Sequence, residues 1–226
     1  MFELERKRNL KKLSLIAVIA AVVFAFTVFA PVSEANTIPF TDINNSDPEF
    51  YNAVVELYAD GVVFGKTDTK YEPNSRATRG ETAEMIVSAL GWDNESPTNP
   101  NFSDVKTTHK YYKSIAILAN KKIISGSEGK FRPDGELTRA QIAKILTLAL
   151  ELEQSTSTKT PFTDVTKVAA ETQRYIATLV DYEITKGATA TTFNPNGKMT
   201  RKQLTLFLHR GLKNVDDGDF EIIGIE

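Results

Sequence analysis

Three arginines at repeated positions are the residues of this chain best suited to binding an anion. Each belongs to a Thr-Arg pair, and each lies six residues after a proline. The arginines are Arg79, Arg139 and Arg201. A guanidinium group presents several N–H donors in a planar fork that matches a carboxylate or a phosphate. Recurrence at intervals of 60 and 62 residues predicts one supersecondary unit used three times, with a function that is also repeated.

Each arginine also lies at an electrostatically unfavourable position. The Thr of each pair is followed three residues later by Glu81, Gln141 or Gln203, which is the pattern of a capping box that starts a helix. The arginine is then the first helical residue, where the helix dipole disfavours a positive charge by about 0.3–1 kcal/mol. A compensating partner is therefore expected at all three positions.

Two kinds of partner fit. An aspartate opens each repeat in a Phe-x-Asp triplet, and these residues are Asp42, Asp104 and Asp164. They could form structural salt bridges with the arginines. Alternatively, an external anion could be held by the arginine together with the exposed N–H donors of the helix start. The two readings are compatible, because a carboxylate can orient a guanidinium that also binds a ligand.

The elements around these residues are helical. Apolar pairs at i, i+3 follow each opening triplet, and they are Val54 and Leu57, Ile115 and Leu118, and Ile176 and Leu179. A loop with a glycine and a proline then leads to the second helix. One helix-loop-helix unit has too little interior to be stable alone. The sequence therefore predicts a mainly α fold, in which three such repeats pack as a bundle with approximate threefold symmetry.

The N-terminal segment has the pattern of a secretory signal peptide. Five basic residues precede the apolar stretch Leu13–Ala30, and Pro31 and Ser33-Glu34-Ala35 follow it. We expect cleavage after residue 35; an uncleaved anchor is the alternative, since 18 apolar residues approach the roughly 20 that span a bilayer. The predicted domains are the signal peptide (1–35), three repeats (36–98, 99–157 and 158–212) and a short tail (213–226).

Composition excludes several classes of function. The chain has no cysteine, and therefore no disulfide, thiolate zinc site or cysteine nucleophile. Residues 1–35 hold five basic and three acidic side chains, which leaves 22 basic and 26 acidic residues in the rest. A nucleic-acid partner is not expected without a basic stripe. The two histidines, His109 and His209, occupy non-equivalent positions, and no catalytic motif is present. We expect no enzyme, metal or cofactor.

The combined motifs resemble the S-layer homology (SLH) domain in three tandem copies. The similarity rests on the Phe-x-Asp openings, the Gly and Phe/Tyr-x-Pro loops, and the sequences Thr-Arg-Gly-Glu, Thr-Arg-Ala-Gln and Thr-Arg-Lys-Gln. It covers nearly all of the chain after residue 35. The resemblance implies a three-pronged fold around a central helical bundle, with ligand grooves between the prongs.

The same resemblance implies a function and roles for residues. It implies a non-catalytic anchor that binds a secondary cell-wall polysaccharide, often pyruvylated, attached to peptidoglycan. Arg79, Arg139 and Arg201 would meet the ketal carboxylate, and the opening aspartates would bind sugar or orient the arginines. The loop glycines would let the backbone approach the saccharide, and they are Gly65, Gly126 and Gly187.

The expected location is the bacterial cell surface. The chain is expected to be exported to the cell wall of a Gram-positive-type bacterium, and to meet the membrane only transiently through its signal peptide. Since only residues 213–226 follow the third repeat, no anchored enzyme domain is expected. The alternative function is a surface protein-interaction module that binds no glycan itself. Binding to purified wall polymer without added protein discriminates the two.

Overall fold

The fold is mainly helical and contains the three expected helix-loop-helix repeats. The structure is a computed structural model that describes residues 37–216. Within that range, isolated bridges replace any longer strand. The helices are α2 (Pro48–Ala59), α3 (Arg79–Ala89), α4 (Tyr112–Asn120), α5 (Arg139–Ala149), α6 (Ala170–Asp181) and α7 (Arg201–Asp216), with short 3₁₀ helices η1 (Trp92–Asn94) and η2 (Thr163–Lys167). The prediction of a mainly α, three-repeat fold is confirmed. The predicted signal peptide and most of the predicted tail lie outside the described residues.

Each second helix begins at the predicted capping box. In α3, the Thr78 hydroxyl accepts the N–H of Glu81 at 3.2 Å, and the Glu81 carboxylate accepts the N–H of Thr78 at 3.1 Å. The same reciprocal pair starts α5 with Gln141 and α7 with Gln203. Glutamine serves as well as glutamate because the cap N–H requires only an oxygen acceptor. The arginine that follows each threonine is the first helical residue, as predicted.

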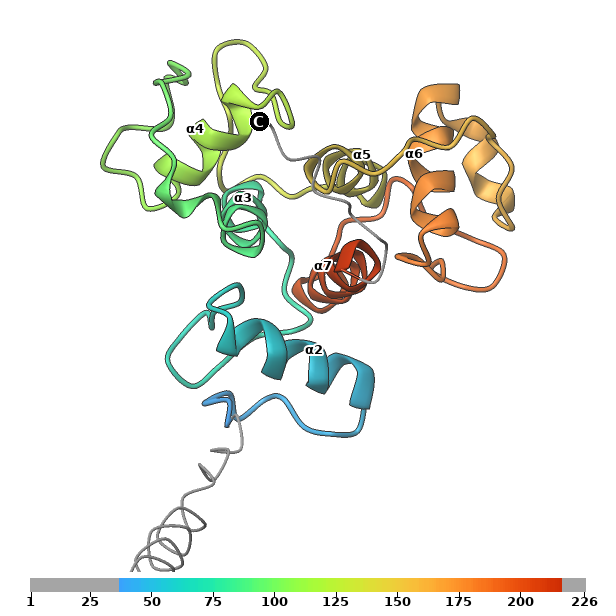
Figure 1. The fold of residues 1–226 in the computed structure, drawn as a ribbon, viewed down its shortest axis with the longest axis horizontal. Helices are drawn as coiled ribbons and strands as arrows, with labels where there is room; N and C mark the ends of the chain where they lie inside the picture. The colour runs from blue at the N-terminus through green and yellow to red at the C-terminus, as the bar shows by residue number, and fades with distance from the viewer. Residues whose placement is uncertain (1–36, 217–226) are drawn as a thin grey trace, which may run out of the picture. The chain divides into compact units, whose positions relative to one another are not determined.

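The second helices α3, α5 and α7 lie in the middle of the molecule, with α2, α4 and α6 outside them (Figure 1). Each outer helix packs mainly on the second helix of the preceding repeat: α4 on α3, α6 on α5, and α2 on α7. The outer helix of the first repeat therefore packs on the inner helix of the third repeat, and the contacts between repeats close a circle. The approximate threefold symmetry stays a prediction.

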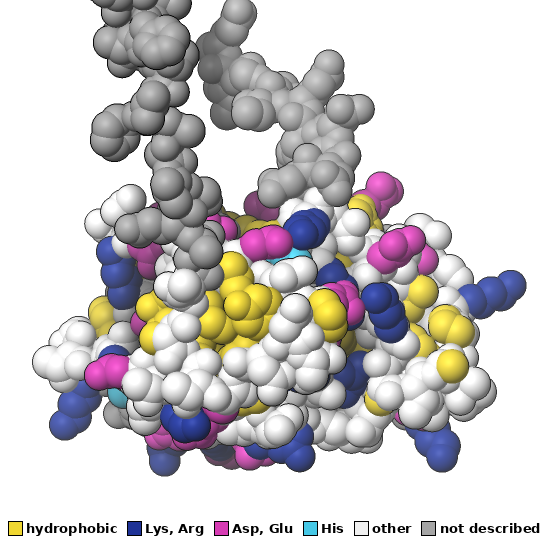
Figure 2. All heavy atoms as spheres, turned by 90° about the horizontal axis from the view of Figure 1, so that it is seen from below, with side chains coloured by type: hydrophobic (Ala, Val, Ile, Leu, Met, Phe, Trp, Pro, Cys, Tyr) yellow, Lys and Arg dark blue, Asp and Glu magenta, His cyan; other side chains and the backbone are white. Residues whose placement is uncertain are grey.

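The core contains the residues that the helical spacing singles out. The six members of the i, i+3 pairs in the outer helices are at most 3% exposed. The inner helices contribute Ile86, Ile142 and Leu204, which are fully buried. The surface is mixed in charge. Figure 2 shows Lys and Arg side chains distributed around one face among Asp and Glu, with no single basic face in that view.

The segments before the inner helices pair with one another. Isolated antiparallel bridges join Thr78 to Glu136, Thr138 to Lys198, and Arg76 to Thr200. Every pair of repeats is linked in this way, so the three Thr-Arg pairs lie at one end of the inner helices. Between residues 37 and 216, no helix has both the length and the apolar character needed to cross a membrane.

Candidate functional site

The three arginines reach from their own repeat into the loop of the next. Each Nε donates to a backbone carbonyl, with distances of 2.8 Å from Arg79 to Phe131, 2.6 Å from Arg139 to Phe193 and 2.9 Å from Arg201 to Tyr71. Each guanidinium also lies 4.4–4.6 Å from the centre of the same residue's ring. The carbonyl dipole and the negative face of the ring attract the cation. They compensate the positive charge at the first helical position.

The aspartates hold the other side of the same loop residues. Asp104 accepts the N–H of Phe131 at 2.8 Å and that of Arg132 at 2.7 Å. Burial alone would raise the pKa of the Asp104 carboxyl, but these backbone hydrogen bonds outweigh it and hold the pKa below its ordinary value. Asp42 and Asp164 make the same pair of bonds in the other two loops.

Direct salt bridges between these aspartates and the arginines are absent from residues 37–216. That reading of the sequence is wrong. Asp104 instead accepts the N–H of Phe131 while Arg79 donates to its carbonyl. One residue of the loop is therefore fixed from two sides, by a carboxylate of its own repeat and by a guanidinium of the preceding repeat.

The helix starts offer no free donors to an anion. The N–H groups of Arg79 and Gly80 donate to the carbonyls of Gly135 and Pro133, both at 2.8 Å. The first two N–H groups of α5 and α7 bind the equivalent loop carbonyls of the next repeat, and the third donates to the capping threonine. The expectation of exposed helix N–H donors is therefore wrong, and an anion here depends on side chains.

The loop glycines have a packing reason of their own. A Cβ at Gly126 would lie 2.5 Å from the carbonyl oxygen of Lys130 and 2.5 Å from the ring of Phe102. Gly65 and Gly187 meet a loop carbonyl and the opening phenylalanine in the same way. No side chain fits there, so close packing alone accounts for glycine. Contact between these glycines and a saccharide stays a prediction.

The candidate residues come together across repeats rather than within them. The Arg79 site combines Arg79 with Asp104 and Gly126 of the second repeat. The Arg139 site combines Arg139 with Asp164 and Gly187. The Arg201 site combines Arg201 with Asp42 and Gly65, so the last repeat completes the site of the first. These groupings follow from the hydrogen bonds of the arginines to the loops.

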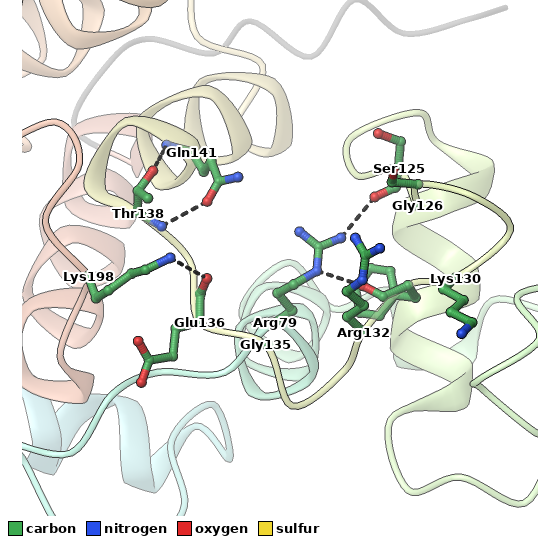
Figure 3. Close-up of a pocket in the computed structure, with 12 residues that line it drawn as sticks. Arg79, Ser125, Gly126, Lys130, Arg132, Gly135, Glu136, Thr138, Gln141 and Lys198 are labelled. Atoms are coloured by element: carbon green, nitrogen blue, oxygen red, sulfur yellow. Dashed lines mark hydrogen bonds between the residues drawn. The ribbon is translucent and has the colours of Figure 1, made fainter.

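The Arg79 site opens into a cavity of about 420 Å³ (Figure 3). Lys130, Arg132 and Lys198 also line it, against one acidic residue, Glu136. Burial, and then the charge of Arg132, lowers the pKa of Arg79 from its ordinary value. A smaller cavity of about 170 Å³ also borders Arg79, and its apolar wall consists of Ile123, Ile124, Leu137 and Ile145.

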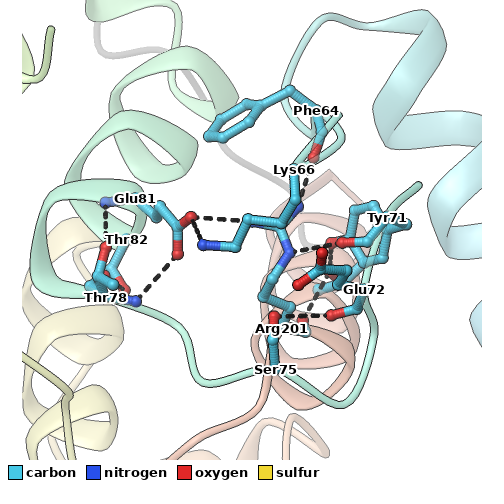
Figure 4. Close-up of polar contacts among 10 residues, drawn as sticks. Phe64, Lys66, Tyr71, Glu72, Ser75, Thr78, Glu81, Thr82 and Arg201 are labelled. Carbon is cyan, nitrogen blue, oxygen red and sulfur yellow. Dashed lines mark hydrogen bonds and ion pairs between the residues drawn. The ribbon is translucent and has the colours of Figure 1, made fainter. Parts of the chain in front are cut away.

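The Arg201 site is closed by charges of the protein itself (Figure 4). Arg201 is 1% exposed, and its Nη1, which has no hydrogen-bond partner among the described residues, lies 3.4 Å from Oε1 of Glu81. The same carboxylate oxygen also pairs with Lys66. The sequence distinguishes Glu81 from Gln141 and Gln203 by its charge, but it does not predict the contact between Glu81 and Arg201.

The Arg139 site is buried but has no such carboxylate. Arg139 is 3% exposed, its Nη1 lies 3.7 Å from the Met199 sulfur, and its Nη2 has no hydrogen-bond partner among the described residues. Burial lowers the pKa of Arg139 to about 10. The guanidinium therefore remains protonated at neutral pH. In all three sites an aspartate and an arginine fix the same loop residue. The sites differ in the exposure of the arginine and in whether a carboxylate pairs with it.

The loop aromatic residues and His209 are buried in the part of the chain that the structure describes. Tyr71, Phe131 and Phe193 are at most 2% exposed, so these loop aromatic residues pack in the core. His209 is 8% exposed and its Nε2 lies 2.7 Å from a carboxylate oxygen of Glu56. His209 is therefore a buried residue of α7 with an acidic partner. In the described part of the chain, no three His, Asp or Glu side chains are grouped so as to hold a metal ion.

Comparison with known protein families identifies the repeats. The S-layer homology domain matches residues 39–83, 101–143 and 161–205. The chain belongs to the S-layer homology family. Each matched segment contains one Phe-x-Asp opening and one Thr-Arg pair, so the matches cover the residues of all three sites. Together the repeats form a cell-surface anchoring module.

The similar proteins are larger surface proteins and enzymes. The chain is 31% identical, over 87% of its length, to the Surface-layer 125 kDa protein of Lysinibacillus sphaericus, and spans 17% of that protein. It is 30% identical to the Cellulosome-anchoring protein of Acetivibrio thermocellus, over 63% of the chain and 33% of that protein. The Exoglucanase XynX of Acetivibrio thermocellus is 29% identical over 76% of the chain, which spans 16% of the enzyme.

Proposed function

We propose that this S-layer homology chain is a non-catalytic anchor that binds an anionic, pyruvylated secondary cell-wall polysaccharide attached to peptidoglycan. The proposal includes export through the predicted signal peptide and retention in the wall of a Gram-positive-type bacterium. The observation that carries it is the Arg79 site, where a guanidinium borders a cavity with three further basic side chains and one acidic side chain.

The chemistry of Arg79 suits a carboxylate ligand. A guanidinium has five N–H donors, and the fold uses one on the carbonyl of Phe131 through Nε and one on the carbonyl of Ser125 through Nη2. The other donors belong to a side chain that is only partly buried. Because the carbonyl bonds and the Phe131 ring fix its orientation, the guanidinium loses little freedom when it binds an anion.

The two cavities beside Arg79 suit the rest of a pyruvate ketal. This group places a carboxylate next to a methyl group and two sugar oxygens. The polar cavity offers Lys130, Arg132 and Gln141 for the carboxylate and the sugar oxygens. The smaller cavity offers Ile123 and Ile145 as an apolar wall for the methyl group. A neutral saccharide would leave Arg79 and Lys130, which pair with no carboxylate among residues 37–216, without a counter-charge, whereas Arg132 already pairs with Glu128 at 3.1 Å.

Binding of an anionic polymer must depend on local recognition, because the overall charge of the chain is negative. The whole chain has a net charge of −2, and an anionic polymer would be mildly repelled at long range. Attachment therefore depends on the sites and on several sites engaging one polymer. Linked weak sites gain roughly 10²–10⁴ in avidity when the geometry allows simultaneous binding.

Co-sedimentation with purified cell walls tests the proposal. Residues 36–226 should sediment with intact walls and remain in solution after the secondary polymer has been removed chemically. Arg79→Gln should weaken retention by about tenfold or more, because a hydrogen bond to a charged group contributes about 1.5–3 kcal/mol and each 1.4 kcal/mol is about tenfold in affinity. Arg174→Gln on α6 is the matched control, since Arg174 lines none of the cavities described above.

The other outcomes each exclude a part of the proposal. Binding that persists after removal of the polymer would make peptidoglycan the ligand. Absence of binding to intact walls, with the fold retained, would favour the protein-interaction module. Turnover of wall polysaccharide by the purified chain would refute the non-catalytic assignment.

A further inference from the structure

Glu81 differs from the residues at the same position in the other repeats. Its side chain is buried, with 4% of its surface exposed, and it contacts both Arg201 and Lys66. Burial alone would raise the pKa of Glu81, but hydrogen bonds from Lys66 and Thr78 and the charge of Arg201 outweigh it and hold the pKa low. The carboxylate is therefore ionised at neutral pH, next to the arginine that an external anion would need.

The capping function does not require this charge. Gln141 and Gln203 form the same capping box through an amide oxygen. Gln141 lines the open cavity of Arg79 as a neutral residue. A carboxylate at position 81 is thus not explained by helix initiation, whereas its contact with Arg201 is a specific interaction between the first and third repeats.

We infer that Glu81 is an internal carboxylate that competes with the anionic ligand for Arg201, so that the Arg79 site binds the ligand first. The inference rests on the proposed function and makes the three sites unequal. A ligand carboxylate that approaches Arg201 must displace Glu81 or share the guanidinium with it, and like charges at this distance repel. At the Arg79 site, the corresponding neighbour Gln141 carries no charge.

Arginine side-chain NMR on residues 36–226 tests this. These residues include the compact unit from Ile38 onward, which has its own core. The Nε–Hε signals of Arg79 and Arg201 report their own sites during titration with a synthetic hexosamine that carries a pyruvate ketal. The methyl ester of the same sugar, which has no charge, is the ligand control. In the wild type, Arg79 should respond at a concentration about tenfold lower than Arg201.

Glu81→Gln is the decisive variant because it keeps the capping box and removes only the charge. It should lower the concentration at which Arg201 responds by about tenfold and leave the response of Arg79 unchanged. Glu84→Gln makes the same change in net charge on the same helix and should alter neither. Unfolding curves of both variants would establish that the fold is retained.

The outcomes separate the inference from the function on which it rests. If Arg79 and Arg201 respond together in the wild type, or if Glu81→Gln does not change Arg201, the inference is wrong while the glycan-binding function stands. If no arginine signal responds to the acid, or if all respond equally to the neutral ester, the proposed function itself fails and the inference fails with it.

Discussion

Replacing the buried Arg201 should destabilise the fold far more than replacing Arg79. Both arginines donate two hydrogen bonds to carbonyls of a neighbouring loop. They differ in their surroundings, since Arg201 is 1% exposed and paired with Glu81, whereas Arg79 is only partly buried and borders the cavity of about 420 Å³. Methionine is the test substitution for both, because it retains most of the aliphatic volume and removes the charge.

The contacts set the size of the difference. Arg201→Met would leave two loop carbonyls without donors, and Glu81 with only Lys66 as a cationic partner. Removing one member of a buried charge pair typically costs about 3–5 kcal/mol. Arg79→Met also frees two carbonyls, but water can reach them through the cavity, so we expect a cost of about 1–2 kcal/mol.

Urea unfolding followed by the fluorescence of Trp92, the sole tryptophan, measures both variants. With a slope of about 2 kcal/mol per molar urea, the midpoint should fall by about 2 M for Arg201→Met and by less than 1 M for Arg79→Met. Equal shifts would refute the reasoning, because burial and the Glu81 pair would then contribute nothing. A practical corollary is that loss of wall binding in Arg201 variants requires a stability control.

Gly126→Ala should lower the free energy of unfolding by about 1–3 kcal/mol, because its Cβ would lie 2.5 Å from the Lys130 carbonyl and from the Phe102 ring; an unchanged urea midpoint would contradict the packing explanation. Thr138→Ala should cost about 0.5–2 kcal/mol through loss of the α5 cap, and Thr138→Ser should restore most of it in the same assay. Asp104→Asn should be destabilising at neutral pH but much less so in acid. The pKa of this carboxyl is lower in the folded chain, so its contribution is complete above the unfolded pKa near 3.8 and is lost as the pH falls through the folded value. The difference in free energy of unfolding between wild type and variant should therefore be smaller at about pH 3 than at about pH 7. An equal difference at both pH values would contradict the stabilising role of the hydrogen bonds that Asp104 accepts from the loop.

The local features of the fold were predictable because they depend on neighbouring residues. The Thr-x-x-Glu/Gln spacing fixes the start of α3, α5 and α7, and the i, i+3 apolar pairs fix the buried face of the outer helices. Arg79 was correctly placed at a first helical position with a need for compensation. Each of these inferences uses residues within one or two helical turns of one another.

The partners of the arginines were not predictable in the same way. The three repeats carry nearly the same motifs, so the sequence favours a bond between Arg79 and its own loop as much as a bond between Arg79 and the next loop. Only three-dimensional packing decides that Arg79 binds Phe131 and that Arg201 binds Tyr71. The closure of the Arg201 site depends in turn on that pairing, because it brings Glu81 of the first repeat to an arginine of the third.

The contact between α2 and α7 gives the molecule a property that open arrays of repeats lack. In an open array the end repeats each have one uncovered face, which allows gradual fraying and allows copies to be added or removed. Here the first repeat covers the last, so there is no end from which unfolding can spread. Losing any one repeat exposes both of its neighbours, and a fourth copy could join only by separating α2 from α7. The number of repeats is therefore set by closure of the ring, and gain or loss of a single copy by gene duplication or deletion would disrupt the whole unit.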